Sequence, residues 1–477
     1  MLFDSSRESS APSLDDSGNS VRNPAALPIV RLSPTDPGFP PRLAFTEADS
    51  QCDCACRMVE SDEPVLLQTP ISFYLELTPL CNNRCHACGN VFVKQGSDRK
   101  LHGLGSPLSA EGWEQIMAKI LPYTHRLKLT GGEPTLHPDF DTIVELVANH
   151  KIPFTLLSNG RWRRPERLVQ LLKRVPTLQG LLLSLHGPSP ARHEAFTGVT
   201  GSFSETLSSI RMAREAGLPV SLSCVITHHN WLQVTEMAEM ARGLGADGVV
   251  FNRYLGHDVA GLTASAEELR SAVNTITGLR AAGHAVKLGN CLPQCFAHTG
   301  QAGCLAGLAF FTIDPWGKVR PCNHAPTVAG DLLQQSVEEI WHSPHMARWR
   351  SFVPSQCTDC SLAASCQGGC RAQALILGRD ADPLIDGPFR PATMLPPTEL
   401  TFYAEARPMG SYVSRAEAFG AVLVSGNRLY PVDRDMQGVL DMLNGQFTLE
   451  QIDAAHGADG LSLVGSLFQH GMLQFVE

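Results

Sequence analysis

Residues 71–90 read ISFYLELTPLCNNRCHACGN, an apolar run that is followed at once by three cysteines. Cys81, Cys85 and Cys88 have the spacing C-x3-C-x2-C. Three thiolates on one short loop can bind three irons of a 4Fe-4S cube, which leaves the fourth iron open to another ligand. An open position separates catalytic metal sites from structural ones. The alternatives are a zinc site or three unrelated thiols, and this spacing directly after a predicted strand argues against both.

Short apolar runs alternate with segments of helical periodicity from residue 71 to about residue 288. Such runs are typical of buried parallel strands. Repeated strand–helix units predict a parallel sheet with right-handed crossovers, so the expected fold class is α/β, a partial (β/α)6 barrel of the TIM-like kind. The six runs are ISFYLEL at 71–77, RLKLT at 126–130, PFTLLS at 153–158, GLLLSL at 180–185, VSLSCVIT at 220–227 and GVVF at 248–251.

Glycine and polar residues follow several of these runs at the carboxyl end, where barrels of this kind build their active sites. The second run leads into Gly131-Gly132-Glu133-Pro134. Two glycines let the backbone approach a ligand closely, and a carboxylate can accept hydrogen bonds from a charged amino group. Further candidates, each equally consistent with a turn or a capped strand end, are Ser158, Asn159, Ser184 and Arg253.

The cysteine loop and the GGEP segment together resemble the radical S-adenosylmethionine superfamily. The resemblance implies that the open iron binds S-adenosylmethionine and that one electron from the cluster cleaves it to a 5′-deoxyadenosyl radical. It also implies that residues 131–134 bind the methionine amino group. Cofactor contacts would come from Ser158 and Asn159, from Ser184 at the ribose and from Arg253 at the carboxylate. The family often has an aromatic residue before the third cysteine; here that residue is Ala87, so the adenine contact is expected from elsewhere.

A second group of cysteines lies in a segment rich in Gly and Pro between residues 288 and 388. The segment shows little periodicity, so we expect it to bury little apolar surface and to be held together by metal. Two closely spaced pairs alone would fit a zinc ribbon. The spacings C-x12-G-x4-C and C-x2-C-x5-C-x3-C instead resemble the SPASM extension of the superfamily, which binds auxiliary iron-sulfur clusters. The eight thiols are Cys291, Cys295, Cys304, Cys322, Cys357, Cys360, Cys366 and Cys370.

Eight thiols are enough for two auxiliary 4Fe-4S clusters. The resemblance assigns Cys304, Cys322 and Cys370 to one cluster, with either Cys291 or Cys295 as its fourth ligand. The other cluster would use Cys357, Cys360 and Cys366. The fourth ligand of that cluster stays open: the remaining upstream cysteine, Asp359 or none. Related enzymes often have a cysteine near the stretch GRDADPLIDGP at 378–388, and this chain has none after Cys370.

The composition is that of a soluble globular protein with 15 cysteines. A net charge of −9 argues against a nucleic-acid partner, and no run of apolar residues is long enough to span a membrane. Without a secretory signal at the start of the sequence, we expect a cytoplasmic protein with reduced thiols. Cys52, Cys54 and Cys56 are interpreted as reduced cysteines in a disordered tail, Cys224 as a core thiol, and His228 and His229 as part of an exposed loop.

The last 67 residues, 411–477, are expected to form a small domain with a hairpin around Ser425-Gly426-Asn427 and three short helices, a winged-helix-like arrangement. The stretches RAEAFGAVLV, MQGVLDMLNGQFT and LVGSLFQHGML resemble the peptide-recognition domain of peptide-modifying radical enzymes. In that family a leader peptide adds a strand to the sheet edge. The predicted organisation is a mostly disordered tail at 1–65, a radical core at 66–287, an iron-sulfur domain at 288–388, a linker at 389–410 and this domain.

These features predict an enzyme that modifies a ribosomally made precursor peptide by hydrogen abstraction, giving a thioether, a carbon–carbon crosslink or an epimer. The expected partners are the precursor peptide, whose leader the C-terminal domain would bind, and a reductase such as flavodoxin or ferredoxin. The alternatives are a protein maturase of the sulfatase-maturase kind, a radical enzyme acting on a small molecule or cofactor, and a non-catalytic iron-sulfur electron carrier. The GGEP segment argues against the carrier, which needs no pocket for S-adenosylmethionine. No catalytic acid or base can be named from the sequence.

Overall fold

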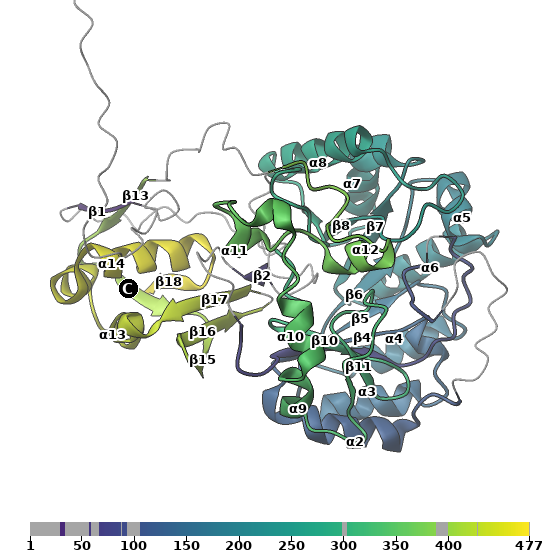
Figure 1. Cartoon of the computed structure of the whole chain (residues 1–477), viewed down its shortest axis with the longest axis horizontal. Coiled ribbons are helices and arrows are strands. Elements are labelled where there is room, and N and C mark those ends of the chain that lie inside the picture. The colour runs from purple at the N-terminus through teal and green to yellow at the C-terminus, as the bar shows by residue number, and fades with distance from the viewer. Residues whose placement is uncertain are drawn as a thin grey trace, which may run out of the picture.

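The computed structural model describes residues 29–33, 57–58, 66–86, 88–92, 105–297, 303–387, 399–426 and 428–476. Within these residues the largest sheet has ten strands in the order β12-β11-β10-β3-β4-β5-β6-β7-β8-β9 (Figure 1). Six of its strands are parallel neighbours in chain order, as predicted. They are β3 (Ser72–Glu76), β4 (Arg126–Thr130), β5 (Phe154–Ser158), β6 (Leu178–Ser184), β7 (Val220–Ile226) and β8 (Gly248–Arg253).

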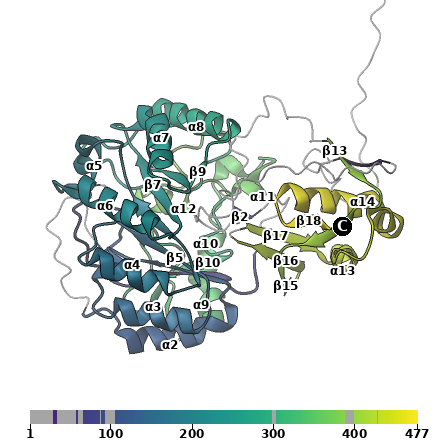
Figure 2. The same ribbon diagram turned by 180° about the vertical axis from the view of Figure 1, so that it is seen from behind.

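Helices connect these strands and cover the outer side of the sheet (Figure 2). Their apolar stripes and the two-sided burial of the strands form the main core, in which Trp113, Phe154 and Phe251 are almost fully buried. The partial (β/α)6 architecture predicted from the alternating pattern is therefore confirmed. The helices are α2 (Ala110–Ile120), α3 (Phe140–Asn149), α4 (Pro165–Lys173), α5 (Pro190–Thr197), α6 (Ser202–Glu215), α7 (Val234–Gly243) and α8 (Ala266–Ala281).

The segment after residue 288 extends this sheet. β9 (Val286–Leu288) pairs with β8, and β10 (Phe310–Ile313) joins the opposite side of the sheet in parallel with β3. β11 (Lys318–Arg320) and β12 (Gly330–Asp331) then add antiparallel strands. Phe311 and Trp341 enter the main core, so the expectation that this segment buries little apolar surface is wrong. Its helices are α9 (Val337–Trp341), α10 (Pro344–Arg350), α11 (Ala363–Cys366) and α12 (Arg371–Ile376).

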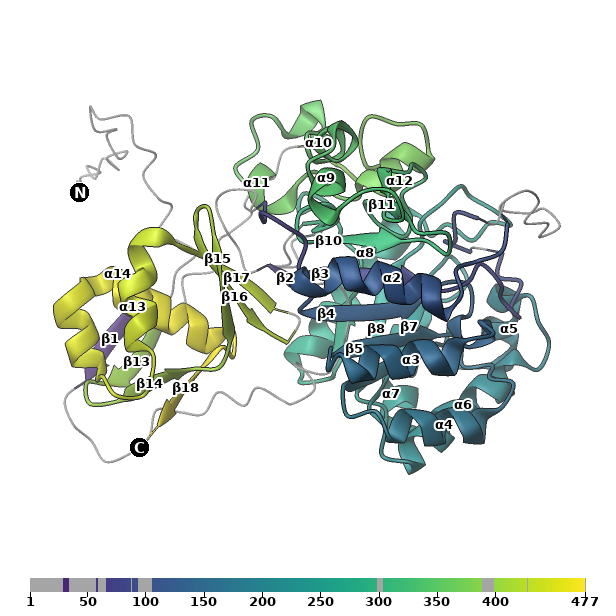
Figure 3. The same cartoon turned by 90° about the horizontal axis from the view of Figure 1, so that it is seen from below.

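The C-terminal part contains the predicted hairpin, β16 (Gly420–Ser425) with β17 (Arg428–Asp433), and β15 (Val413–Glu417) precedes it. α13 (Gln437–Met442) and α14 (Leu449–Gln469) follow, and α14 breaks at Gly457, whose φ is 61°, so the three predicted helices are present. Figure 3 shows β15–β17 on the side of this domain that faces the barrel. The winged-helix relationship itself stays a prediction. The other strands are β13 (Glu399–Tyr403), β14 (Arg407–Gly410) and β18 (Leu473–Val476).

Two short strands from the segment predicted as a mostly disordered tail pair with the C-terminal part. β1 (Ile29–Ser33) runs parallel to β13, and Val30 and Leu32 pack on the apolar core of that part. β2 (Arg57–Met58) runs parallel to the start of β17. The N-terminal segment therefore supplies backbone partners to a domain that is more than 300 residues away in sequence.

Candidate functional site

A cavity of about 430 Å³ opens at the carboxyl ends of the parallel strands. The three thiols of Cys81, Cys85 and Cys88 line it, because their loop follows β3 directly. The structure thus brings the predicted cysteine loop together with most of the predicted strand-end residues. Those that line the same cavity are Gly131, Gly132, Ser158, Asn159, Ser184 and Arg253.

The sulfur of Cys81 accepts two hydrogen bonds from polar groups of the protein. The Asn83 backbone N–H donates to Cys81 Sγ at 3.4 Å, and Asn159 Nδ2 donates at 3.5 Å. Asn159 also donates to Asn82 Oδ1 at 2.7 Å, which ties β5 to the cysteine loop. Hydrogen bonds to cysteine sulfurs are one of the means by which proteins set the potential of an iron-sulfur cluster. This arrangement fits a cluster ligand at Cys81.

The two glycines after β4 are required by the cysteine loop. A Cβ on Gly131, whose φ is +143°, would lie 2.6 Å from the carbonyl oxygen of Thr78, and one on Gly132 would lie 2.2 Å from that of Leu80. The Gly132 N–H donates to Thr78 O and the Glu133 N–H to Leu80 O, each at 2.7 Å. The glycines therefore allow β4 to pack against the start of the cysteine loop, in addition to lining the cavity.

Glu133 lies behind the cavity lining and is fully buried. Its carboxylate accepts hydrogen bonds from Thr135, from Ser158 Oγ and from the Asn159 N–H, the last at 2.7 Å. Burial raises its pKa, against the opposing effect of these donors. Glu133 thus joins the ends of β4 and β5, while Pro134 begins a short 3-10 turn and is also buried. The predicted contact of this segment with the methionine amino group stays a prediction.

Arg161 was missed by the sequence reasoning. Its Nη1 donates to Asn82 O at 2.5 Å and to Asn83 Oδ1 at 2.9 Å, and its Nε pairs with Glu205 at 2.8 Å. One guanidinium therefore holds the cysteine loop against the end of β5 and the start of α6. An arginine in the polar string that follows β5 carries no signal of this role, because the side chains that it contacts are 44 and more residues away.

Arg253 is engaged in a buried ion pair. Its Nη1 donates to Asp382 Oδ1 at 3.0 Å, and its Nη2 donates to Asp382 Oδ2. A contact of Arg253 with a cofactor carboxylate stays a prediction, and the pair with Asp382 uses only one N–H of Nη1 and one of Nη2. Ser184 is half-buried at the end of β6, beside the buried His186, which also lines the cavity.

His186 is a second residue that the sequence reasoning passed over. Its Nδ1 accepts the Val225 N–H at 3.2 Å, which places the ring proton of the neutral form on Nε2. Burial, together with the nearby His193, holds its pKa well below the usual range for histidine. The ring is therefore a neutral donor on the cavity wall, fixed between β6 and β7.

The same cavity is lined by four thiols of the second cysteine group, Cys291, Cys304, Cys322 and Cys370. Three of them interact directly: hydrogen bonding with Cys291, together with the positive charges of Arg371 and Arg253, lowers the pKa of Cys304 to about 6. Hydrogen bonds with Cys304 and Cys370 raise the pKa of Cys291. Thiols that share protons in this way are close enough to act as one donor set. We call these residues the inner four thiols.

The other four cysteines, Cys295, Cys357, Cys360 and Cys366, line a separate small pocket together with Ile385. Burial and the neighbouring Cys366, Cys360 and Cys295 raise the pKa of Cys357 to about 11. We call them the outer four thiols. Within the described residues, no three Cys, His, Asp or Glu side chains converge on a single-ion site. A 4Fe-4S cube binds each thiolate through its own iron, so its ligands surround a volume rather than a point.

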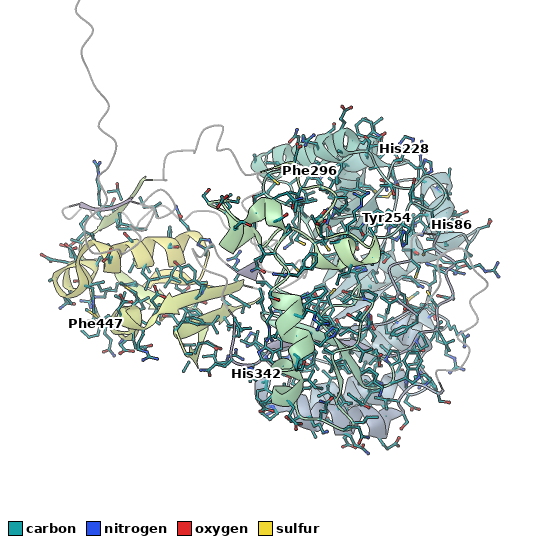
Figure 4. All side chains as sticks on the ribbon, viewed as in Figure 1. His86, His228, Tyr254, Phe296, His342 and Phe447 are labelled. Atoms are coloured by element: carbon teal, nitrogen blue, oxygen red, sulfur yellow. The ribbon has the colours of Figure 1, made fainter. Side chains whose placement is uncertain are left out.

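Cys224 was interpreted as a core thiol and His228 as part of an exposed loop, and both lie where they were expected. Cys224 is buried in the main core, and burial raises its pKa to about 12. His228 is exposed and contacts Glu268, and Figure 4 shows it near the outer edge of the molecule, away from Tyr254. Cys52, Cys54, Cys56 and Ala87 lie outside the described residues. Within the described part of the chain, no helix is long and apolar enough to cross a membrane.

Two family models match the chain. The radical SAM superfamily model matches residues 75–241, and the SPASM model, an iron-sulfur cluster-binding domain, matches residues 304–361. The first range contains the cysteine loop and the GGEP segment. The second contains Cys304, Cys322, Cys357 and Cys360.

Curated relatives are similar over most of their length. A PqqA peptide cyclase of Xanthomonas campestris pv. campestris is 29% identical over 328 residues, which cover 65% of this chain and 85% of the relative. An AdoMet-dependent heme synthase of Methanosarcina barkeri is 27% identical, over 63% of this chain and 90% of the relative.

Among solved structures, Streptococcus suis SuiB bound to precursor peptide SuiA superimposes with a TM-score of 0.56 at 18% identity. The match covers 67% of this chain and 77% of SuiB, and it supports the barrel fold described above. With the family matches and the cavity lined by the predicted cysteine loop, these findings indicate a protein that binds iron-sulfur clusters and S-adenosylmethionine. The chain is a radical SAM enzyme with a SPASM iron-sulfur domain.

Proposed function

We propose that this enzyme modifies a ribosomally made precursor peptide by hydrogen abstraction, with a thioether, a carbon–carbon crosslink or an epimer as the product. The observation that carries the proposal is the single cavity lined both by Cys81, Cys85 and Cys88 and by the inner four thiols. A cluster on the cysteine loop, once reduced, supplies the electron that cleaves S-adenosylmethionine. A substrate residue in this cavity would lie between that cluster and an auxiliary one.

The peptide as substrate class is supported by the relatives and by the C-terminal domain. The Xanthomonas relative is named as a peptide cyclase, and SuiB was solved with a precursor peptide. In the C-terminal domain β17 lies against α14, where Tyr430 Oη donates to Ser466 Oγ at 2.8 Å. A leader peptide would pair with β17 and lie along α14. Among the described residues, β2 pairs only with Arg428 and Leu429, at the start of β17.

We assign one auxiliary 4Fe-4S cluster to the inner four thiols and one to the outer four. The first uses Cys291 as its upstream ligand. The second uses Cys295, because this residue lines the outer pocket with Cys357, Cys360 and Cys366. Ile385, from the stretch in which relatives often have a cysteine, lines the same pocket. In this assignment Cys295 takes the place of the downstream cysteine that relatives often have. Flavodoxin or ferredoxin would reduce the clusters.

Iron counting combined with product analysis tests the radical chemistry. Reconstituted protein should hold about twelve irons and form 5′-deoxyadenosine with S-adenosylmethionine and dithionite under anaerobic conditions. A Cys81→Ala, Cys85→Ala, Cys88→Ala variant should keep about eight irons and form none. If iron-replete protein forms no 5′-deoxyadenosine, the radical chemistry is rejected and the non-catalytic electron carrier is the remaining function.

Single cysteine variants test the allotment. Cys295→Ala should lower the iron and sulfide content by up to about four atoms each, change the outer cluster's EPR signal and leave the inner signal unchanged. Cys291→Ala should also lower the iron and sulfide content, but it should change the inner cluster's EPR signal and leave the outer signal unchanged. Cys224→Ala, in the core, should change neither EPR signal. If Cys295→Ala leaves both auxiliary signals and the iron content intact, Cys295 is not a ligand.

A second candidate substrate class is a small molecule, favoured by the similarity to the AdoMet-dependent heme synthase. The two are distinguished by coexpression with short open reading frames that neighbour the gene, followed by mass spectrometry of the peptides. A mass change that requires an intact leader supports the peptide. If no neighbouring peptide is modified by active enzyme, whereas a small molecule from cell extract is consumed together with S-adenosylmethionine, the small-molecule reading holds.

A further inference from the structure

A buried ion pair joins the end of β8 to the segment after the last cysteine. Nη1 and Nη2 of Arg253 donate to Oδ1 and Oδ2 of Asp382, and the two side chains are 4% and 0% exposed. Removing two charges from water costs several kcal/mol per ion, which such a pair regains only in good geometry. A pair of this kind is therefore weak evidence for stability and calls for another role.

Both partners are hydrogen-bonded to residues at or next to the inner thiols. The Cys370 N–H donates to Asp382 Oδ2 at 2.7 Å, and a Cβ on Gly369 would lie 2.6 Å from the same oxygen. On the other side, the backbone N–H and C=O of Arg253 exchange two hydrogen bonds of 2.9 Å with the side-chain amide of Asn290, the residue before Cys291. The ion pair thus contacts the peptide group of Cys370 directly, and the backbone of Arg253 is tied to the residue next to Cys291.

The two charges of the pair lie close to these sulfurs, because Asp382 accepts the Cys370 N–H and Arg253 pairs with Asp382. Arg253 Nε is buried, and within the described residues it has no hydrogen-bond partner. Arg253 also lines the cavity together with all of the inner four thiols. The cation therefore faces the thiols, and the carboxylate holds it there.

We propose that the Arg253–Asp382 pair sets the reduction potential of the auxiliary cluster bound by the inner four thiols. Reduction adds one electron, so the cluster and its thiolates become more negative by one charge. A cation beside them stabilises the reduced form and raises the potential, and an anion lowers it. Arg253 is a positioning residue in this role, since it acts through the cluster environment.

The inference rests on the proposed cluster allotment, and its test is an EPR-monitored redox titration of reconstituted full-length protein. The background is Cys81→Ala, Cys85→Ala, Cys88→Ala, in which only auxiliary clusters remain. The signal that Cys322→Ala removes belongs to the inner cluster. Arg253→Met should shift its potential to more negative values, and Asp382→Asn should shift it to more positive values. The potential of the outer cluster serves as the internal reference.

Arg214→Met is the matched control. Arg214 pairs with Asp247 at 3.1 Å. Asp247 directly precedes β8 and therefore lies about 20 Å along the strand from Arg253. The Arg214→Met substitution removes the same kind of charge and should leave both potentials unchanged. Opposite shifts for the two test variants support the proposal, because a purely structural pair would not respond with opposite signs.

Three results overturn the inference. These are unchanged inner potentials in fully loaded variants, shifts of the same sign, or loss of the inner cluster in both variants, which would make the pair a structural clamp. If the background protein itself lacks an inner cluster, the proposed allotment fails instead. The iron content therefore separates failure of the allotment from failure of the tuning role.

Discussion

The sulfur of Cys81 shows how much of the site is decided by single side chains. Its two N–H donors come from Asn83 and Asn159, and Arg161 donates to the backbone carbonyl of Asn82 in the same loop. The guanidinium is 12% exposed, so its hydrogen bonds are sheltered from water. Hydrogen bonds to charged groups contribute about 1.5–3 kcal/mol each. The geometry of the cysteine loop therefore depends on a residue outside the cysteine motif.

We predict that Arg161→Met lowers the rate of 5′-deoxyadenosine formation by at least about 100-fold, because two such bonds to the cysteine loop are lost. The auxiliary clusters should remain, so the iron content should stay at or above about eight. Arg167→Met is the matched control, since Arg167 pairs with Asp141 at the surface, where its side chain is 65% exposed. Equal rates in the two variants would contradict a role for Arg161 in holding the loop.

His193 makes the stability of the barrel depend on pH. The ring is fully buried, its Nδ1 accepts the His186 N–H at 3.1 Å, and burial together with Arg161 lowers its pKa from 6.5 to about 4. Because the folded pKa lies below the unfolded one, the unfolded state binds more protons on acidification. The contribution of this group is therefore complete above pH 6.5 and is lost as the pH falls toward 4.

We predict that acidification from pH 7.5 to pH 5 costs the parent protein about 2 kcal/mol of unfolding free energy through His193 alone. His193→Asn keeps an acceptor near the Nδ1 position and does not titrate, so its loss over the same range should be smaller by this amount. Anaerobic urea denaturation at the two pH values measures the difference. Parallel losses in the parent and the variant would refute the prediction.

Sequence reasoning found the cluster cysteines but not the residues that support them. A motif such as C-x3-C-x2-C is local, and its chemistry can be deduced from spacing alone. The side chains that pair with the side chains of Arg161 and Asp382 lie 44 to 129 residues away in the chain. Only the folded barrel brings them together, so no local pattern reveals them. Glu133 was found as a motif residue, but its bonds to β5 were not foreseeable.

At the scale of elements, the strands that were predicted correctly are those with continuous apolar runs buried on both faces, β3 to β8. β10 was missed because its short run lies within a segment rich in Gly, Pro and Cys. It becomes a strand by pairing with β3 in parallel, with Phe311 against Phe73 in the register. Tertiary pairing therefore overrides a composition that predicts irregular structure.

The approach of β4 to the cysteine loop gives a prediction at this scale. Gly132→Ala would place a methyl group 2.2 Å from Leu80 O and push the loop away by on the order of 1 Å. Misplacement of this size costs about 100-fold in rate, so 5′-deoxyadenosine formation should fall by that factor. Gly278→Ala in α8, where a Cβ meets nothing within 4 Å, should leave the rate unchanged and stabilise the helix slightly.

Loading of the cysteine-loop cluster is the second measurement on these variants. Gly132→Ala should have fewer irons than the parent, with the auxiliary clusters retained. A Gly132→Ala protein that has the full iron content and the parental rate would show that the loop adapts to the added methyl group, and the close approach would then not be required.

At the scale of the whole molecule, the C-terminal domain and the inner thiols share one apolar cluster. Val422, Val424 and Leu429 of its sheet belong to the same cluster as Cys322 and Cys370. Polar contacts fix the same junction: Arg415 donates to Thr69 O at 3.0 Å, and the Gln68 N–H donates to Glu417 at 2.8 Å. The proposed leader-binding sheet is thus attached directly before β3, the strand that carries the cysteine loop.

This attachment predicts that Arg415→Ala weakens the coupling of leader binding to catalysis. At subsaturating peptide, modification of a leader-containing substrate should fall about tenfold, since loss of a few partly exposed hydrogen bonds costs about 1–2 kcal/mol. Cleavage of S-adenosylmethionine without peptide should be unaffected, because residue 415 lies outside the cavity lining. The two rates are measured by mass spectrometry of the peptide and of 5′-deoxyadenosine. Arg407→Ala, which loses a contact with Gln446 inside the C-terminal domain, is the control and should keep both rates. If Arg415→Ala lowers both rates equally, the junction supports the fold of the barrel, and the domain does not deliver the peptide through it.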